Sequence, residues 1–155
     1  MESGDASGTA LFNPVKREWS KKICDAIDSS IYSMLPPLIS SDKPCGTISK
    51  KASEELGIPF GVPVSSGGGD NMMGAIGTGT VASGVLTMSM GTSGTLYGYS
   101  DSFVADPEKG ISGFCSSSGG YLPLLCTMNC TVVTEYTRDL FALDIAQFNE
   151  LAEKA

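Results

Sequence analysis

The chain has 155 residues, of which 41% are hydrophobic and 17% charged, as is typical of a soluble globular protein with one ordinary core. Its net charge is −7, and it lacks the basic surface that nucleic-acid binding needs, so nucleic acid is not an expected partner. Because histidine is absent, Ser-His-Asp triads, Cys-His dyads and almost all zinc-enzyme ligand sets are excluded, and a general base must be a carboxylate, lysine or tyrosine.

The first predicted elements are short. Residues 4–9 are small and polar and predict a loop, which a short strand at 10–12 follows. Ser20 is expected to be the N-cap of a helix that runs to about Met34, with isoleucines at four-residue spacing as its apolar stripe. Pro36-Pro37 ends this helix.

A strand, a glycine turn and a helix follow one another in the middle of the chain. Residues 49–56 first predict a helix that ends at Gly57. A short strand at 63–66 then enters Gly67-Gly68-Gly69-Asp70-Asn71, and an apolar helix continues through 72–76. Such an arrangement delivers a side chain to the end of a sheet.

A β-hairpin is the clearest prediction in the second half. Strands at 85–90 and 95–99 flank Gly91-Thr92-Ser93-Gly94, a turn bordered by glycines. Residues 110–120 are rich in Ser and Gly and predict a loop. The chain is then expected to form two helices, at 131–141 and 144–154.

The cysteines indicate a reducing environment. Their number is odd, and their spacing contains no CxxC pair; they are Cys24, Cys45, Cys115, Cys126 and Cys130. We expect reduced, mostly buried thiols in a cytoplasmic protein, and no metal site. The first residues have no targeting character, and no apolar run has the length of a membrane span, so no membrane partner is expected.

Asp70 is the first candidate for chemistry. Three glycines before an acid allow tight backbone geometry and leave the carboxylate free of neighbouring side chains, as suits a general base for a hydroxyl proton. The alternative is that Asp70 caps the helix that follows, which the residue type alone favours. The two roles are compatible.

The turn at residues 91–94 is the second candidate. Small residues with hydroxyl groups at a hairpin turn can present amides and hydroxyls to a phosphate. The alternative is an ordinary hairpin turn. Gly74, Gly77 and Gly79 do not have the spacing of a dinucleotide-binding motif, and Met72, Met73, Met88 and Met90 are expected in the core.

Six segments, taken together and in order, resemble the FGGY carbohydrate kinase family over nearly the whole chain. They are Gly4-Asp5-Ala6-Ser7-Gly8-Thr9, Trp19-Ser20, Pro36-Pro37-Leu38, Gly46-Thr47-Ile48, Gly67-Gly68-Gly69-Asp70-Asn71 and Ser89-Met90-Gly91-Thr92-Ser93-Gly94. The resemblance implies an α/β fold of the ribonuclease H-like, actin-like ATPase class. It is partial: residues 1–83 would form the C-terminal part of the first, sugar-binding domain. Residues 84–155 would form the N-terminal part of the second, nucleotide-binding domain.

The resemblance also implies a carbohydrate kinase that uses ATP and Mg²⁺ to phosphorylate a sugar hydroxyl, as part of a longer chain. It places the catalytic base on Asp70, sugar contact on Asp70 and Asn71, and contact with the ATP phosphates on Gly91, Thr92, Ser93 and Gly94. It assigns no metal-binding residue, and it allows a homodimer of the full-length enzyme.

The Asp-Asn pair resembles the xylulokinase branch, whereas glycerol kinases usually show Asp-Gln, so the implied reaction converts D-xylulose to D-xylulose 5-phosphate. Met72 and Met73 depart from the small residues common in that branch. The family's N-terminal phosphate loop and its adenine-binding motif do not match any part of the chain, so we expect residues 1–155 alone to be inactive. The alternatives are another family member, a glycerol or gluconate kinase, or a non-catalytic binding or structural fragment.

Overall fold

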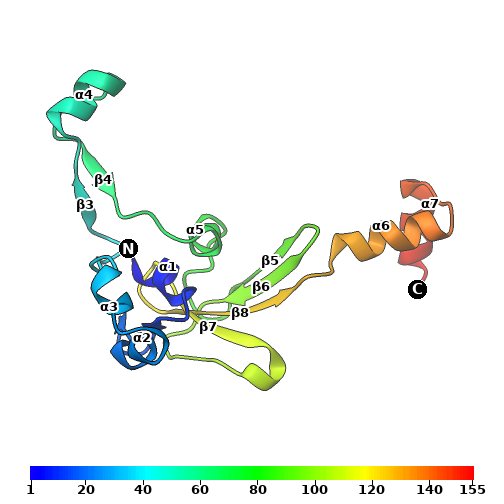
Figure 1. Cartoon of the computed structure of the whole chain (residues 1–155). Coiled ribbons are helices and arrows are strands. Elements are labelled where there is room, and N and C mark those ends of the chain that lie inside the picture. The colour runs from blue at the N-terminus through cyan, green and yellow to red at the C-terminus, as the bar shows by residue number, and fades with distance from the viewer.

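The computed structural model describes residues 1–155 and has an elongated shape, with parts of the chain extending away from a centre (Figure 1). Helices α1 to α3 gather at the centre, and a two-stranded arm with helix α4 extends from them. A four-stranded sheet leads in another direction to helices α6 and α7, which lie at the far end of the molecule. None of the helices is both long and apolar enough to span a membrane.

The central part contains one helix that was not predicted. Its elements are α1 (Ser3–Ser7), β1 (Phe12–Asn13), β2 (Glu18–Trp19), α2 (Lys21–Ile27) and α3 (Ile31–Met34). The prediction of a loop at 4–9 is wrong, because the buried carboxylate of Glu2 accepts hydrogen bonds from the Gly4 and Asp5 amides and starts α1 there.

The helix predicted from residue 21 to about residue 34 is divided in two. Ser20 is its N-cap as predicted, accepting a bond from the Ile23 amide. The helix stops at Asp28, because that carboxylate accepts bonds from both the amide and the hydroxyl of Ser30 and so favours a turn. The isoleucine stripe does not join the core, as Ile27 is 66% exposed.

The first arm consists of β3 (Pro44–Thr47), α4 (Lys50–Leu56) and β4 (Pro63–Ser65), and it leads into α5 (Asp70–Gly77). Strand β4 pairs antiparallel with β3 alone. Helix α4 is confirmed, with Ser49 as N-cap and Gly57 at φ +67°, a conformation that favours glycine at a helix end. Helix α5 also begins and ends close to the predicted bounds.

The sheet contains β5 (Leu86–Met90), β6 (Gly94–Gly98), β7 (Ile111–Cys115) and β8 (Tyr121–Thr127), in the antiparallel order β5-β6-β8-β7. The hairpin of β5 and β6 is confirmed, with Met90 opposite Gly94. The loop predicted at 110–120 is wrong, since β7 pairs with β8 from Ile111 opposite Leu125 to Cys115 opposite Tyr121. A short 3-10 turn, η1 (Pro107–Lys109), precedes it.

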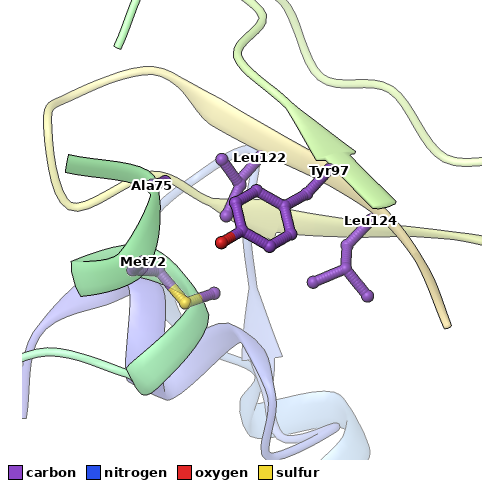
Figure 2. Packing of buried hydrophobic residues seen from close by; sticks show 5 residues of the cluster. All are labelled: Met72, Ala75, Tyr97, Leu122 and Leu124. Carbon is purple, nitrogen blue, oxygen red and sulfur yellow. The ribbon is translucent and has the colours of Figure 1, made fainter. Parts of the chain in front are cut away.

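The main core lies between α5 and one face of the sheet. It is formed by Met72, Ala75, Tyr97, Leu122 and Leu124, and Figure 2 shows the Tyr97 ring between the helix and the strands. On the opposite face Met88 and Met90 are 62% and 66% exposed, so their predicted place in the core is wrong. The polar side of β5 faces inward instead, because Thr87 bonds to the hydroxyls of Thr78 and Thr80.

A smaller cluster joins the N-terminal elements to the sheet. It contains Ala6, Phe12 and Cys115, with Trp19 packed edge-on against Phe12. All five cysteines are free, but only Cys24 and Cys115 are buried, so the expectation that most are buried is wrong. Cys45 lies on the exposed β3–β4 arm and Cys126 on β8.

The last two helices are α6 (Thr131–Leu140) and α7 (Ile145–Glu153), as predicted. Helix α7 starts with a capping box, in which the Asp144 carboxylate accepts from the Gln147 amide and the Gln147 side chain accepts from the Asp144 amide. Neither helix has a buried residue.

Candidate functional site

Asp70 is the first residue of α5 and its side chain is exposed. Gly69, not Asp70, occupies the N-cap position, and no side chain caps the helix, so the capping alternative is wrong. The bond that Asp70 accepts within the chain comes from the adjacent Asn71 amide, at 2.7 Å from Oδ1. The other carboxylate oxygen is therefore free to accept a proton or a hydrogen bond from a ligand.

The glycine run before Asp70 is closely packed. Gly67 has φ +71°, which favours glycine. A Cβ atom at Gly68 would lie 3.2 Å from Ser117 Oγ, and one at Gly69 would lie 2.9 Å from Met72 Sδ. Larger residues at these positions would push the run, and Asp70 with it, away from the sheet and α1.

Helix α5 meets the sheet at β6, beside Asp70 and Asn71. The Thr95 hydroxyl donates to Asn71 Oδ1 at 3.5 Å, the upper limit for a hydrogen bond. Tyr97, two residues further along β6, is 4% exposed. Burial raises the pKa of its phenol, and the negative charge of Asp70 raises that pKa further. Asp70 therefore lies close enough to β6 for its charge to act on Tyr97.

The turn between β5 and β6 has the features of an anion site. The carbonyl oxygens of Gly91 and Thr92 accept bonds from the amides of Thr131 and Cys130, at the start of α6. The amides and hydroxyls of Thr92 and Ser93 make no hydrogen bond within the chain, and both residues are exposed. Four donors thus remain available to a phosphate, while the two carbonyl oxygens that would repel it are already occupied.

The structure brings the two predicted constellations together along β6. Gly94 ends the turn and begins the strand, and the next residue, Thr95, contacts Asn71. An exposed carboxylate and a turn with free hydrogen-bond donors, joined through this contact, have the groups that the transfer of a phosphoryl group to a hydroxyl group requires. Among residues 1–155, no group of three or more His, Cys, Asp or Glu side chains is placed to hold a metal ion.

Sequence reasoning missed the surroundings of this site. A pocket of about 550 Å³ lies between the N-terminal part and the β7–β8 turn, with eight polar or glycine residues among the ten that line it. Arg17 and Ser117 both border it. Neither belongs to a local motif, and they line one pocket because Arg17 binds the carbonyl oxygen of Gly119, 102 residues away and two residues after Ser117.

Comparison with known proteins defines the class. Residues 1–77 match the model of the N-terminal domain of the FGGY family of carbohydrate kinases. Several curated relatives match more than nine-tenths of the chain. The chain belongs to the FGGY family of carbohydrate kinases.

The relatives narrow the resemblance to one branch. The chain is 44% identical over 99% of its length to the xylulose kinase of Haemophilus influenzae, and 35% identical over 92% to that of Streptomyces rubiginosus. These matches cover 32% and 29% of the two relatives, so the chain spans about a third of their length.

Solved structures confirm the expected fold class. The xylulose kinase of Bifidobacterium adolescentis matches 100% of the chain and 33% of its own, with a TM-score of 0.80 and 26% identity. A ligand-bound xylulose kinase from Lactobacillus acidophilus gives a TM-score of 0.87 at 21% identity, over 100% of this chain and 32% of its own. The chain is part of a ribonuclease H-like, actin-like sugar kinase fold.

Proposed function

We propose that the chain is the part of an ATP-dependent sugar kinase that carries its catalytic base, and that D-xylulose is the acceptor and D-xylulose 5-phosphate the product. The observation that carries this proposal is the match of 99% of the chain, at 44% identity, to a xylulose kinase. The exposed Asp70 carboxylate beside a turn with free donors supports the same reaction.

Asp70 is the base in this proposal. Its free carboxylate oxygen accepts the proton of the acceptor hydroxyl as that oxygen attacks the γ-phosphorus of ATP and the bond to the ADP oxygen breaks. Asn71, whose side-chain amide nitrogen makes no bond within the chain, donates to a neighbouring sugar hydroxyl and orients it. Both residues act from the rigid first turn of α5.

Gly91, Thr92, Ser93 and Gly94 hold the ATP phosphates. The free amides and hydroxyls of Thr92 and Ser93 bind phosphate oxygens, and the exposed Gly91 lets the backbone approach closely. Gly94 keeps the turn close to Cys130, because a Cβ atom there would lie 3.0 Å from the Cys130 sulfur. Bound Mg²⁺ would neutralise phosphate charge, and it usually takes one or two carboxylates together with the phosphates. Among residues 1–155 no group of three or more His, Cys, Asp or Glu side chains could hold the ion without the phosphates.

We also propose a domain boundary near residue 83, with residues 1–83 in the sugar-binding domain and 84–155 in the nucleotide-binding domain. The family model, which covers residues 1–77, and the start of the sheet at Leu86 both support it. The free cysteines support a cytoplasmic location, where thiols stay reduced.

The test uses a full-length protein. Residues 1–155 replace the matching third of the Haemophilus influenzae xylulose kinase, and this chimera is assayed for ADP release with xylulose, glycerol and gluconate. We expect xylulose to be the preferred acceptor. Preference for glycerol or gluconate would assign the chain to another branch, and absence of kinase activity with all three would refute the proposal.

Asp70→Asn in the chimera separates the base from a structural role. The substitution keeps the shape of the side chain and removes its basicity, so kcat should fall by about 100-fold to 10,000-fold with little change in thermal stability. Asp25→Asn is the matched control, because Asp25 is an exposed carboxylate on α2 that pairs only with Lys21. Normal turnover by Asp70→Asn would contradict the assignment.

A further inference from the structure

A turn distant in sequence is fastened to the N-terminal part of the molecule. The guanidinium of Arg17 donates to the carbonyl oxygen of Gly120 at 2.8 Å and to that of Gly119, and it lies 5.5 Å from the centre of the Tyr121 ring. The Ser7 hydroxyl accepts a bond from the Cys115 amide. The turn that joins β7 to β8 is thus held at both ends, by Ser7 at Cys115 and by Arg17 at Gly119 and Gly120.

Hydrogen bonds within the turn define its shape. The Ser116 and Ser118 hydroxyls are 2.7 Å apart, and the Ser118 amide donates to Ser116 Oγ. Ser116 also donates its amide to the Gly120 carbonyl, the oxygen that Arg17 binds. Ser117 is therefore presented in one position at the tip of the turn.

Ser117 lies against the glycine run that leads to Asp70. Its hydroxyl is the single buried side-chain nitrogen or oxygen of the chain with no hydrogen-bond partner. A Cβ atom at Gly4 would lie 2.9 Å from this oxygen, and one at Gly68 would lie 3.2 Å from it. The Ser117 hydroxyl thus lies between Gly4 of α1 and Gly68, which is two residues before Asp70.

We propose that Ser117 is a positioning residue for Asp70, with Arg17 holding it in place. A buried hydroxyl without a partner costs stability, so a serine at this site is not explained by folding alone. Its contact with Gly68 limits where the run can move, and the first turn of α5 carries Asp70 with it. This proposal rests on the function proposed above, because it concerns the base of that reaction.

The chimera provides the kinetic test, with Ser117→Ala as the main variant. Removing the oxygen opens space beside Gly68, so we expect kcat to fall about tenfold and the KM for xylulose to change less than about twofold. Thermal stability should stay the same or rise, since an unpaired buried hydroxyl is lost. A purely structural serine would give unchanged kcat, which would overturn the proposal.

Each test variant has a control: an exposed serine for Ser117→Ala, and the second arginine for Arg17→Lys. Ser112→Ala removes an exposed hydroxyl of β7 that makes no hydrogen bond within the chain, and it should keep kcat within about twofold. Arg17→Lys keeps the charge but cannot bridge two carbonyls while stacking on a ring, so it should lower kcat as Ser117→Ala does. Arg138→Lys, at the chain's other arginine, should have no such effect, because that guanidinium pairs with the adjacent Asp139.

A second measurement does not depend on activity. Backbone ¹⁵N relaxation in residues 1–155 reports the order of the Gly68 and Gly69 amides. We expect Ser117→Ala to lower their order parameters from about 0.85 to about 0.6 and Ser112→Ala to leave them unchanged. Unchanged values in Ser117→Ala would overturn the positioning role. An inactive chimera, or an active Asp70→Asn variant, would instead refute the proposed function.

Discussion

Replacing Glu2 by alanine should unfold α1 and loosen the cluster that supports the glycine run. Glu2 is fully buried, and its carboxylate accepts three bonds: from the Gly4 amide at 2.8 Å, the Asp5 amide at 2.6 Å and the Ser41 hydroxyl at 2.8 Å. In Glu2→Ala the buried Gly4 amide has no acceptor, whereas the exposed Asp5 backbone can turn to water.

The magnitude follows from these contacts. One unsatisfied buried donor costs about 1 to 3 kcal/mol, and the loss of a helix cap about 1 kcal/mol more. We therefore expect the free energy of unfolding of the N-terminal part to fall by about 3 kcal/mol. Glu2→Gln keeps the length of the side chain but leaves one acceptor oxygen where two are used. Its free energy of unfolding should therefore lie between those of Glu2→Ala and of the native protein.

Trp19 makes this change measurable. It is the only tryptophan, and its ring packs against Phe12 in the same cluster as Ala6 of α1. Urea unfolding followed by tryptophan fluorescence therefore reports on this region. Glu54→Ala, at an exposed glutamate of α4, is the control and should change the unfolding free energy by less than about 0.5 kcal/mol. A loss below about 1 kcal/mol in Glu2→Ala would refute the reasoning.

Three further predictions follow from the core, from Tyr97 and from the thiols. Leu122→Ala should cost about 2 to 5 kcal/mol in urea unfolding, because Leu122 is fully buried, while Leu140→Ala, 65% exposed, should cost little; equal losses would contradict the packing in Figure 2. The raised pKa of Tyr97 means that its contribution to stability is complete below the ordinary tyrosine pKa and is lost as the pH rises through its own higher value. Ultraviolet titration should show one late phenol that Tyr97→Phe removes and that Asp70→Asn shifts to lower pH, and no shift would place Asp70 away from β6. Iodoacetamide should modify the exposed Cys45 and Cys126 first and Cys115 last, since burial raises the pKa of the Cys115 thiol; early labelling of Cys115 would mean that its cluster is open.

Elements whose signals are local were predictable from the sequence. Ser20, Ser49 and Asp144 each start a helix with their own side chain, and Gly57 ends one in a left-handed conformation. These preferences act over three or four residues, so they hold whatever the rest of the chain does. The β5–β6 hairpin was predictable for the same reason, because its strands alternate and its turn is short.

Elements that depend on distant partners were not predictable. Helix α1 has a sequence of small polar residues and exists because Glu2 is buried beneath it. Strand β7 looks like a loop until β8 pairs with it. The methionines of β5 face outward because the Thr87 hydroxyl, on the other face of the strand, bonds to Thr78 and Thr80. An alternating sequence pattern does not indicate which of the two faces will be buried.

The sequence by itself determined the family, through Gly67-Gly68-Gly69-Asp70-Asn71 and the other ordered segments, because such motifs reflect local geometry that tolerates few residue types. It left open whether Asp70 caps its helix. Only the tertiary structure decided this, by placing Gly69 at the cap and leaving the carboxylate exposed beside β6. It alone brought Ser117 against Gly68, because that contact joins positions 49 residues apart whose packing no local preference encodes.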